Sequence, residues 1–483
     1  MLLFLLLLLM SCTSQASHFF GTLITYYPTD VRSDGAVTVV LRSKLNFRSC
    51  NDYTHATWQC HRGNCGSQTS AVAGTVDSES TGQFCQTEVV YTRQVSTNAP
   101  FQLWLNSGNW ISGIVNRIVS WRALIRVELR NRSDTGQANR SPQTTILPVV
   151  RVPSNCPRQL NLLTFDPDGD EVKCRYGDAS EDECNPCTPP SVLNLSSSCT
   201  LSFGPTGSGN QGPYAVQLVM EDFPRQSITL TQTDGTKENR TTDTSISKIP
   251  VQFVLQVDPV VPSCTDGLYL PRFLPPTPDH GVQLYVLVNQ TLEIRIQAEA
   301  NMSTISELLF SGPHNMAENR SGPGEYTLTW SPSPSEAGQS HPVCFLVQAV
   351  LNSTKYHSDL RCIIMTVGGT PITTTTLAPT TVSSTTTLAP TTVSSTTTLA
   401  PTTVFSTATE TVTNSTTRPI TAVTSAPAGT QNFIVALHLK ISSSSPLTED
   451  NIEDTFLQQL KDELVRQGLP SSTTLRLLRI TEP

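Results

Sequence analysis

The sequence of 483 residues has little charge and no cluster of basic side chains. Lysine and arginine total 31 against 39 aspartates and glutamates, which gives a formal net charge of −8. Nucleic acids and anionic lipid surfaces attract proteins through concentrated positive charge. Neither is therefore predicted as a partner.

Motifs of the common enzyme classes are also absent. The sequence contains no G-x-S-x-G, no H-E-x-x-H, no P-loop and no G-x-G-x-x-G. Its eight histidines are scattered between His18 and His438. The sequence therefore predicts a protein that is not an enzyme, with no catalytic residue and no organic cofactor. Catalytic triads depend on geometry rather than on chain order, so this expectation rests on missing motifs alone.

Long hydrophobic runs are confined to the first ten residues, MLLFLLLLLM. Ser14 and Ala16 follow at the −3 and −1 positions of a cleavage site before Ser17, so residues 1–16 are predicted to be a secretory signal peptide. A membrane anchor is the alternative, but the run has about half of the ~20 residues that span a bilayer. The last residues, LRLLRITEP, are too short and too charged for a GPI signal. We expect a secreted, extracellular protein without a membrane span.

Cysteine is absent after residue 362, and its distribution before that point indicates disulfide bonds. Without the signal peptide the chain keeps an even set of twelve, Cys50, Cys60, Cys65, Cys85, Cys156, Cys174, Cys184, Cys187, Cys199, Cys264, Cys344 and Cys362. In an oxidising compartment, complete pairing is favoured over a zinc site such as Cys184-x-x-Cys187 with Cys174 and Cys199. Cys344 and Cys362 lie on two strand-like runs separated by a turn, so we predict a bond between them.

Sites for N-linked glycosylation agree with this compartment. The motif N-x-S/T begins at Asn131, Asn139, Asn194, Asn239, Asn289, Asn301, Asn319, Asn352 and Asn414. Pro142 follows the motif of Asn139, which lowers the expected occupancy of that site.

Residues 370–430 contain almost only Thr, Ser, Pro, Ala and Val, and repeat the unit TTTLAPTTVSS. A segment of this composition cannot bury a core and stays extended. We predict a mucin-like, O-glycosylated linker, with an unglycosylated flexible linker as the alternative.

The chain before this linker is predicted to be mostly β. Strand-like runs separated by turns divide it into an N-terminal module with four cysteines (17–152) and two β-sandwich-like modules (153–262 and 263–369) of immunoglobulin or cadherin type. The clearest strand is IPVQFVLQV, in which five apolar residues from Ile249 to Val257 alternate and should share one face.

The last residues, 431–483, have a different pattern. An alternating run from Phe433 to Ile441 is followed by an amphipathic stretch that begins near Thr448 and ends at Gly468. A second strand-like run, TLRLLRI, completes a predicted βαβ module. A single helix leaves strand edges open, so the module is expected to form a homodimer along Phe433–Ile441 or Thr474–Ile480.

Three carboxylates in one loop form a candidate calcium site in the sequence. Asp166, Asp168 and Asp170, followed by Glu171, are close enough in sequence to offer oxygen ligands to Ca²⁺, which takes six to eight. The alternative is a turn in which Pro167 and Gly169 set the backbone and the Asp side chains cap it. The turn is the favoured interpretation.

Several motifs in order give the head of the chain a family resemblance. CPRQLNLLTFDPDGDEVKCRYG, ECNPC, SSCTLSF and YAVQLVMEDF are followed by LTWSPSPSEAG and YHSDLRC. Residues 17–369 resemble the amino-terminal region of von Willebrand factor D and EGF domain-containing proteins and of integrin beta-like proteins from invertebrates. The resemblance implies an extracellular, disulfide-bonded, non-enzymatic architecture. The chain lacks the D and EGF modules of those proteins. Its last residues loosely resemble half of an SEA module, without the G-S-x-x-V cleavage sequence.

The sequence therefore predicts a secreted glycoprotein that acts in extracellular binding or cell adhesion, with a protein or glycan ligand. The alternative is a structural component of mucus, egg coat or extracellular matrix.

Overall fold

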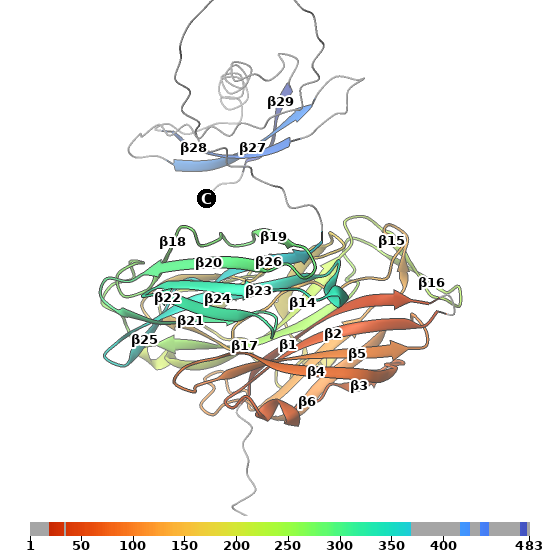
Figure 1. Cartoon of the computed structure of the whole chain (residues 1–483), viewed down its shortest axis with the longest axis horizontal. Coiled ribbons are helices and arrows are strands. Elements are labelled where there is room, and N and C mark those ends of the chain that lie inside the picture. Colours follow the sequence, from red (N-terminus) through yellow and green to blue (C-terminus); the bar gives the residue numbers. More distant parts are fainter. Residues whose placement is uncertain (1–18, 33–34, 369–415, 426–434, 444–473, 481–483) are drawn as a thin grey trace, which may run out of the picture. The chain divides into compact units, whose positions relative to one another are not determined.

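The computed structural model describes residues 19–32, 35–368, 416–425, 435–443 and 474–480. The chain divides into two compact units, residues 1–377 and 378–483, and each is described by itself. We call residues 19–368 the head, and the strands described in the second unit the tail sheet (Figure 1). The prediction of a mostly β protein is confirmed. Within the described residues, no helix has the length and apolar character that crossing a membrane requires.

Helical structure in the head is limited to four short 3-10 turns. They are η1 (Asp52–His55), η2 (Ala179–Glu181), η3 (Ser208–Asn210) and η4 (Pro334–Glu336).

Eleven strands form the largest sheet of the head (Figure 1). They are β1 (Phe19–Val31), β2 (Val37–Phe47), β3 (Gln59–Arg62), β4 (Ser67–Ser78), β5 (Cys85–Val95), β6 (Phe101–Asn109), β7 (Ser120–Val127), β9 (Val149–Pro153), β11 (Glu171–Tyr176), β14 (Gly212–Phe223) and β17 (Lys248–Asp258). Eight strands follow the order β3-β6-β7-β17-β1-β2-β5-β4, while β9 and β14 also pair with β17, and β11 pairs with β14.

The strand β17 holds this sheet together. It pairs antiparallel with β1, β7 and β14 and parallel with β9. The alternation from Ile249 to Val257 correctly predicts a strand, but both faces of β17 are buried rather than one. Its polar residue Gln252 is 1% exposed and donates from Nε2 to the Arg122 carbonyl at 2.6 Å. Because β17 has neighbouring strands along both edges and is packed on both faces, neither of its faces is exposed to solvent.

Because β17 and β14 share a sheet with β1 and β2, the predicted boundary between residues 152 and 153 does not divide the head. Strands from both predicted modules lie in one sheet and bury one continuous core. Two small sheets flank it. One contains β8 (Asn131–Arg132), β15 (Ile228–Thr231) and β16 (Lys237–Arg240), and the other β10 (Arg158–Asn161), β12 (Leu193–Leu195) and β13 (Thr200–Phe203).

Residues 263–368 form a two-sheet sandwich. One sheet is β18 (Arg272–Leu274), β20 (Leu292–Glu299), β23 (Glu325–Trp330) and β22 (Ala317–Gly322), and the other is β19 (Gln283–Val286), β26 (Arg361–Val367), β24 (Ser340–Leu351), β21 (Thr304–Ser311) and β25 (Thr354–His357). Apolar side chains of both sheets, among them Ile296, Trp330 and Phe345, share one core. Alternating residues face inward on β20 and β23, as expected for strands with one solvent face.

A cluster of buried charges joins this sandwich to the eleven-stranded sheet. Glu88 of β5 is 2% exposed and binds Lys44 of β2 at 3.0 Å and His314 at 2.8 Å. Arg42 reaches Glu336 of η4 at 2.9 Å. Burial lowers the pKa of Lys44, and the charge of Glu88 opposes that effect. The two charges stabilise each other in a place that water does not reach.

All twelve cysteines in the head are paired. The disulfides are Cys50–Cys85, Cys60–Cys65, Cys156–Cys264, Cys174–Cys199, Cys184–Cys187 and Cys344–Cys362. Cys344 of β24 and Cys362 of β26 are direct neighbours across the two strands, with Cα atoms 4.0 Å apart. No thiol in this set is left to bind zinc.

The tail sheet has three strands in the order β28-β27-β29: β27 (Thr416–Ser425), β28 (Val435–Ser443) and β29 (Thr474–Ile480). β28 and β29 match the two predicted strands. Residues 416–425, predicted as part of the extended linker, instead form the central strand and pair antiparallel with both others. Since β27 separates them, β28 and β29 are not direct neighbours. The helix predicted after Thr448 and most of the predicted linker lie outside the described residues.

The buried charge cluster predicts a large effect of removing Glu88. Glu88→Ala leaves the Lys44 ammonium buried without its carboxylate, and should lower the free energy of unfolding by about 3–5 kcal/mol. The matched control is Glu293→Ala, because Glu293 is 58% exposed and pairs with Arg295 on the surface. It should change stability by roughly 0.5 kcal/mol or less. Thermal unfolding of the purified variants measures both, and equal losses would contradict the cluster's role.

Candidate functional site

The loop from Asp166 to Asp170 is closed by hydrogen bonds to its own backbone. Asp166 Oδ1 accepts from the backbone N–H of Asp168 at 2.8 Å and of Asp170 at 3.2 Å. Gly169 has φ of +82°, which a residue with a side chain rarely adopts, and its N–H donates to the Asp166 carbonyl. These are the features of the turn that the sequence offered as the alternative to calcium.

Two arginines neutralise part of the loop's charge. Arg132 of β8, with a fully buried side chain, binds Asp170 through Nη1 and, at 2.8 Å, through Nη2. The same guanidinium binds Asp134 at 2.7 Å. Asp168 points toward Arg140, whose backbone N–H donates to it at 2.7 Å. A fixed guanidinium therefore occupies the position that a cation would take between these carboxylates.

The strand β14 brings another carboxylate, that of Asp222, to the loop. Ligand atoms of Asp166, Asp170 and Asp222 all lie within 4.8 Å of one another, and all three residues are buried. Asp222 of β14 accepts from the backbone N–H and the hydroxyl of Ser247 and from Asn139 Nδ2. Asp222 was not predicted from the sequence. Its only signal is an acidic residue near the end of an apolar strand, in YAVQLVMEDF.

Of the three predicted ligands, Asp166 and Asp170 meet and Asp168 does not join them. Both oxygens of Asp170 bind Arg132, and those of Asp222 are also bonded, so Asp166 Oδ2 alone has no hydrogen-bond partner. Calcium needs six to eight oxygens. The geometry therefore fits the turn with one buried, unpaired carboxylate oxygen better than a calcium site.

Burial sets the protonation of the cluster. It raises the pKa of Asp222 to about 7, with the charge of Asp170 adding to the effect. Burial and the charge of Asp222 hold the pKa of Asp166 well above its usual range. Near neutral pH the pair therefore retains a proton, and Asp166 Oδ2 is a suitable atom to carry it.

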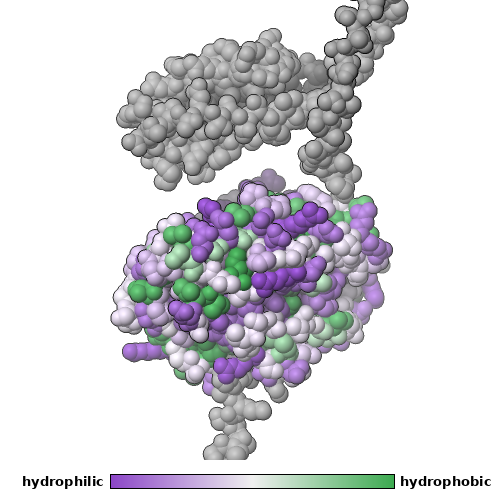
Figure 2. Space-filling view, turned by 60° about the vertical axis from the view of Figure 1, so that its left-hand side comes forward, coloured by the Kyte–Doolittle hydropathy of each residue, from purple (hydrophilic) through white to green (hydrophobic). Residues whose placement is uncertain are grey.

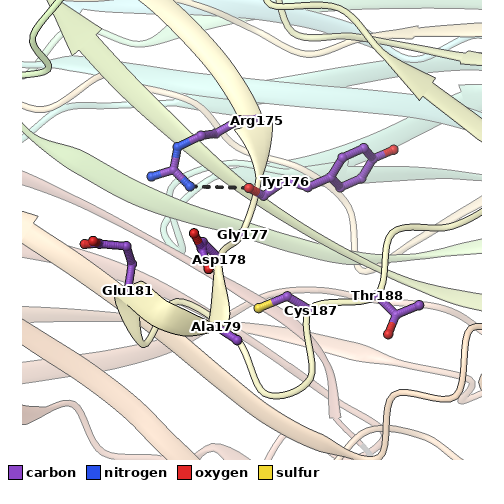
Figure 3. A pocket seen from close by; sticks show the side chains of 8 residues that line it. All are labelled: Arg175, Tyr176, Gly177, Asp178, Ala179, Glu181, Cys187 and Thr188. Atoms are coloured by element: carbon purple, nitrogen blue, oxygen red, sulfur yellow. Dashed lines mark hydrogen bonds between the residues drawn. The ribbon is translucent and has the colours of Figure 1, made fainter.

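An open hollow of about 530 Å³ is lined by residues at the end of β11 and by Cys187 of the disulfide Cys184–Cys187 (Figure 3). Its lining includes Arg175, Asp178 and Glu181, while the ring of Tyr176 points away from them (Figure 3). Arg175 is already paired, with Glu183 at 2.6 Å and Glu221 at 3.0 Å. The side chains therefore do not converge on one point as a catalytic site requires.

The predicted glycosylation sites differ in accessibility. Asn131, Asn194, Asn239, Asn289, Asn301, Asn319 and Asn352 are exposed, and Asn414 lies outside the described residues. Asn139 is 0% exposed, and its Nδ2 donates to Tyr26 Oη at 3.2 Å and to Asp222 at 2.8 Å. A glycan on Asn139 Nδ2 would displace both contacts, so the folded structure disfavours modification at this predicted site.

The carboxylate pair predicts a pH dependence of stability. Because the folded-state pKa values of Asp166 and Asp222 are raised, their contribution is complete at low pH and is lost as pH rises from about 4 to 7. Asp166→Asn keeps the acceptor for the loop and removes one charge. Compared with the unmodified chain, the variant should therefore gain about 1 kcal/mol more free energy of unfolding at pH 8 than at pH 5.

Denaturant unfolding at the two pH values, with chelator present, measures this difference. Adding excess calcium should leave the melting temperature of the unmodified chain unchanged. A calcium-dependent increase that Asp166→Asn removes would instead establish a metal site.

The burial of the Asn139 amide predicts that the motif at this residue is not glycosylated. Peptide mapping of the chain purified from a eukaryotic secretory host should find glycans at the seven exposed asparagines and none at Asn139. Asn139→Gln should also lower the melting temperature, because the longer side chain cannot bridge Tyr26 and Asp222. Asn131→Gln, at an exposed motif, should change it little. Full occupancy at Asn139 would contradict the buried network.

Comparisons with known proteins identify one distant relative and several all-β structures. No protein-family profile matches the chain. Integrin beta-like protein C of Dictyostelium discoideum is 23% identical over 370 residues, which cover 70% of this chain and 18% of that protein. This distant similarity agrees with the integrin beta-like part of the resemblance. The chain spans less than a fifth of that relative's length.

Solved structures with similar parts include tandem immunoglobulin and cadherin domains. The tandem Ig repeats of Dlar are 10% identical, cover 47% of this chain and 97% of their own, and give a TM-score of 0.18. Human protocadherin-24 EC1-2 is also 10% identical, with coverages of 48% and 99% and a TM-score of 0.15. At these scores the alignments carry no argument beyond the mostly β character already described.

Proposed function

We propose that this chain is a secreted glycoprotein that acts in extracellular binding or cell adhesion. The observation that carries the proposal is the head, a mostly β body with six disulfides and seven exposed glycosylation motifs. Disulfides persist in oxidising compartments, and an adhesion-type architecture agrees with the distant similarity to an integrin beta-like protein. The Thr/Ser/Pro-rich linker would carry O-linked glycans and distance the head from whatever the tail binds.

The proposed role is recognition rather than catalysis. Arg175, which lines the described hollow, and Arg132, in the acidic cluster, are held by carboxylates. Fixed ion pairs of this kind stabilise a scaffold and leave few groups free to move protons. A protein or glycan ligand on another extracellular surface is the expected partner.

The experiment is a binding screen with the full secreted chain. Purified from a eukaryotic secretory host, it should label a limited set of cell types and bind particular members of protein and glycan arrays. A chain that labels no cell and instead accumulates in large insoluble assemblies would favour the alternative, a structural component of mucus, egg coat or matrix.

We further propose that the second unit joins two copies of the chain. Among the described strands, β28 and β29 each pair only with β27, so the outer edge of each has no strand beside it. Pairing along one of these edges would satisfy the backbone groups there. Sedimentation of the secreted chain should give a dimer, and a chain ending at residue 377 should be monomeric at micromolar concentration. A monomeric full-length chain would contradict this assignment.

A further inference from the structure

The strand β4 forms one end of the eleven-stranded sheet and is open over much of its length. It pairs with β5, and no other described strand pairs with it. Seven consecutive residues, Ser67–Ala73, are exposed, and Val72 is 56% exposed. From Gly74 to Ser78 the strand is partly covered, because Gly74 lies against the His314 ring and Asp77 accepts from the Phe310 N–H, while Thr75 and Ser78 remain exposed. The open edge is therefore Ser67–Ala73.

The open edge lacks the features by which proteins usually block edge pairing. Natural edge strands carry lysine, proline or inward-pointing charges that prevent a second strand from binding. The sequence from Ser67 to Val76 contains no charged residue and no proline. One β-bulge, at Gln68/Ser70, interrupts the open part. It shortens the regular ladder without closing the edge.

Motifs for N-linked glycosylation are also absent from this part of the sequence. No N-x-S/T motif occurs before Asn131, so β3 to β7 carry none. The exposed motifs lie on other strands and turns of the head, such as Asn194 on β12 and Asn239 on β16. An edge that is exposed, neutral and free of bulky sugars is accessible to another protein backbone.

We propose that the open edge of β4 pairs antiparallel with the same edge of a second copy, as a homophilic contact between heads. This inference rests on the proposed adhesive function and names its partner. A two-fold axis near Ser70 would place Thr69 beside Ala71 and Gln68 beside Val72 of the other copy. Every such pair is neutral, so the self-contact brings no like charges together. A charged foreign strand would find no complementary charge on this edge.

The contact between two heads is small, so adhesion through it should require many such contacts at once. Stable protein interfaces bury roughly 1,200–2,000 Å², which seven edge residues do not supply. On the face of the head shown in Figure 2, hydrophobic residues lie in small separate patches. Single pairs of heads should dissociate rapidly, whereas many chains on each of two surfaces would hold those surfaces together.

The experiment measures clustering of beads that carry the full-length chain. Ser67→Asn completes a glycosylation motif with Thr69 and places a glycan on the open edge. The matched control, Asp234→Asn, completes a motif with Thr236 on the exposed turn between β15 and β16. Beads with the unmodified chain should cluster, Asp234→Asn should leave clustering unchanged, and Ser67→Asn should reduce it at least about tenfold. Equal clustering of both glycan variants would overturn the inference.

A second pair of variants tests the same edge without a glycan, in case the glycan variants do not fold. Val72→Lys adds a charge to the edge, and Val119→Lys adds the same charge at a side chain that is 61% exposed outside β4. Only Val72→Lys should reduce clustering, with both variants secreted and melting normally. Unmodified beads that bind target cells but not each other would overturn the homophilic contact and leave the proposed function intact. Beads that bind neither would contradict both.

Discussion

The head depends on the complete burial of one strand, β17. Its four neighbouring strands come from positions as far apart in the chain as Phe19 and Phe223, so a defect in β17 affects all of them. A strand covered on both faces must place even polar residues in the interior, and Gln252 is held there by the carbonyl of Arg122. The buried Lys44–Glu88 pair has the same role where the sandwich meets the large sheet. At both places, a buried polar or charged side chain that has lost its contact with water is bound by a specific protein group instead.

Local pattern predicted the strands well and their partners poorly. Alternation from Ile249 to Val257 identifies a strand because side-chain direction has a period of two. The pairing of β17 with β1 depends on contacts more than 200 residues apart, which periodicity does not encode. The same limit explains why residues 17–152 and 153–262 were predicted as separate modules. Cys344 and Cys362 were paired correctly because they are only 18 residues apart, on strands β24 and β26 that pair directly.

The acidic loop shows what composition leaves undetermined. Asp166, Asp168 and Asp170 look alike in the sequence, yet one caps the turn, one faces Arg140 and one binds Arg132. The difference comes from residues that are distant in the chain, Arg132 and Asp222 above all. A glycosylation motif is ambiguous in the same way, because Asn139 and Asn131 satisfy it equally and only the fold separates them.

The burial of Asn139 also imposes an order of events on the maturing chain. Oligosaccharide transfer acts on unfolded polypeptide, and the amide that would receive the sugar is the one that links Tyr26 to Asp222. A molecule modified there before β1 and β14 come together would be unable to seat that amide. Such a molecule would keep its interior open, which under the proposed secretion would expose it to the folding machinery of that route. Under the proposed secretion, Pro142, just beyond the motif, would disfavour this early transfer.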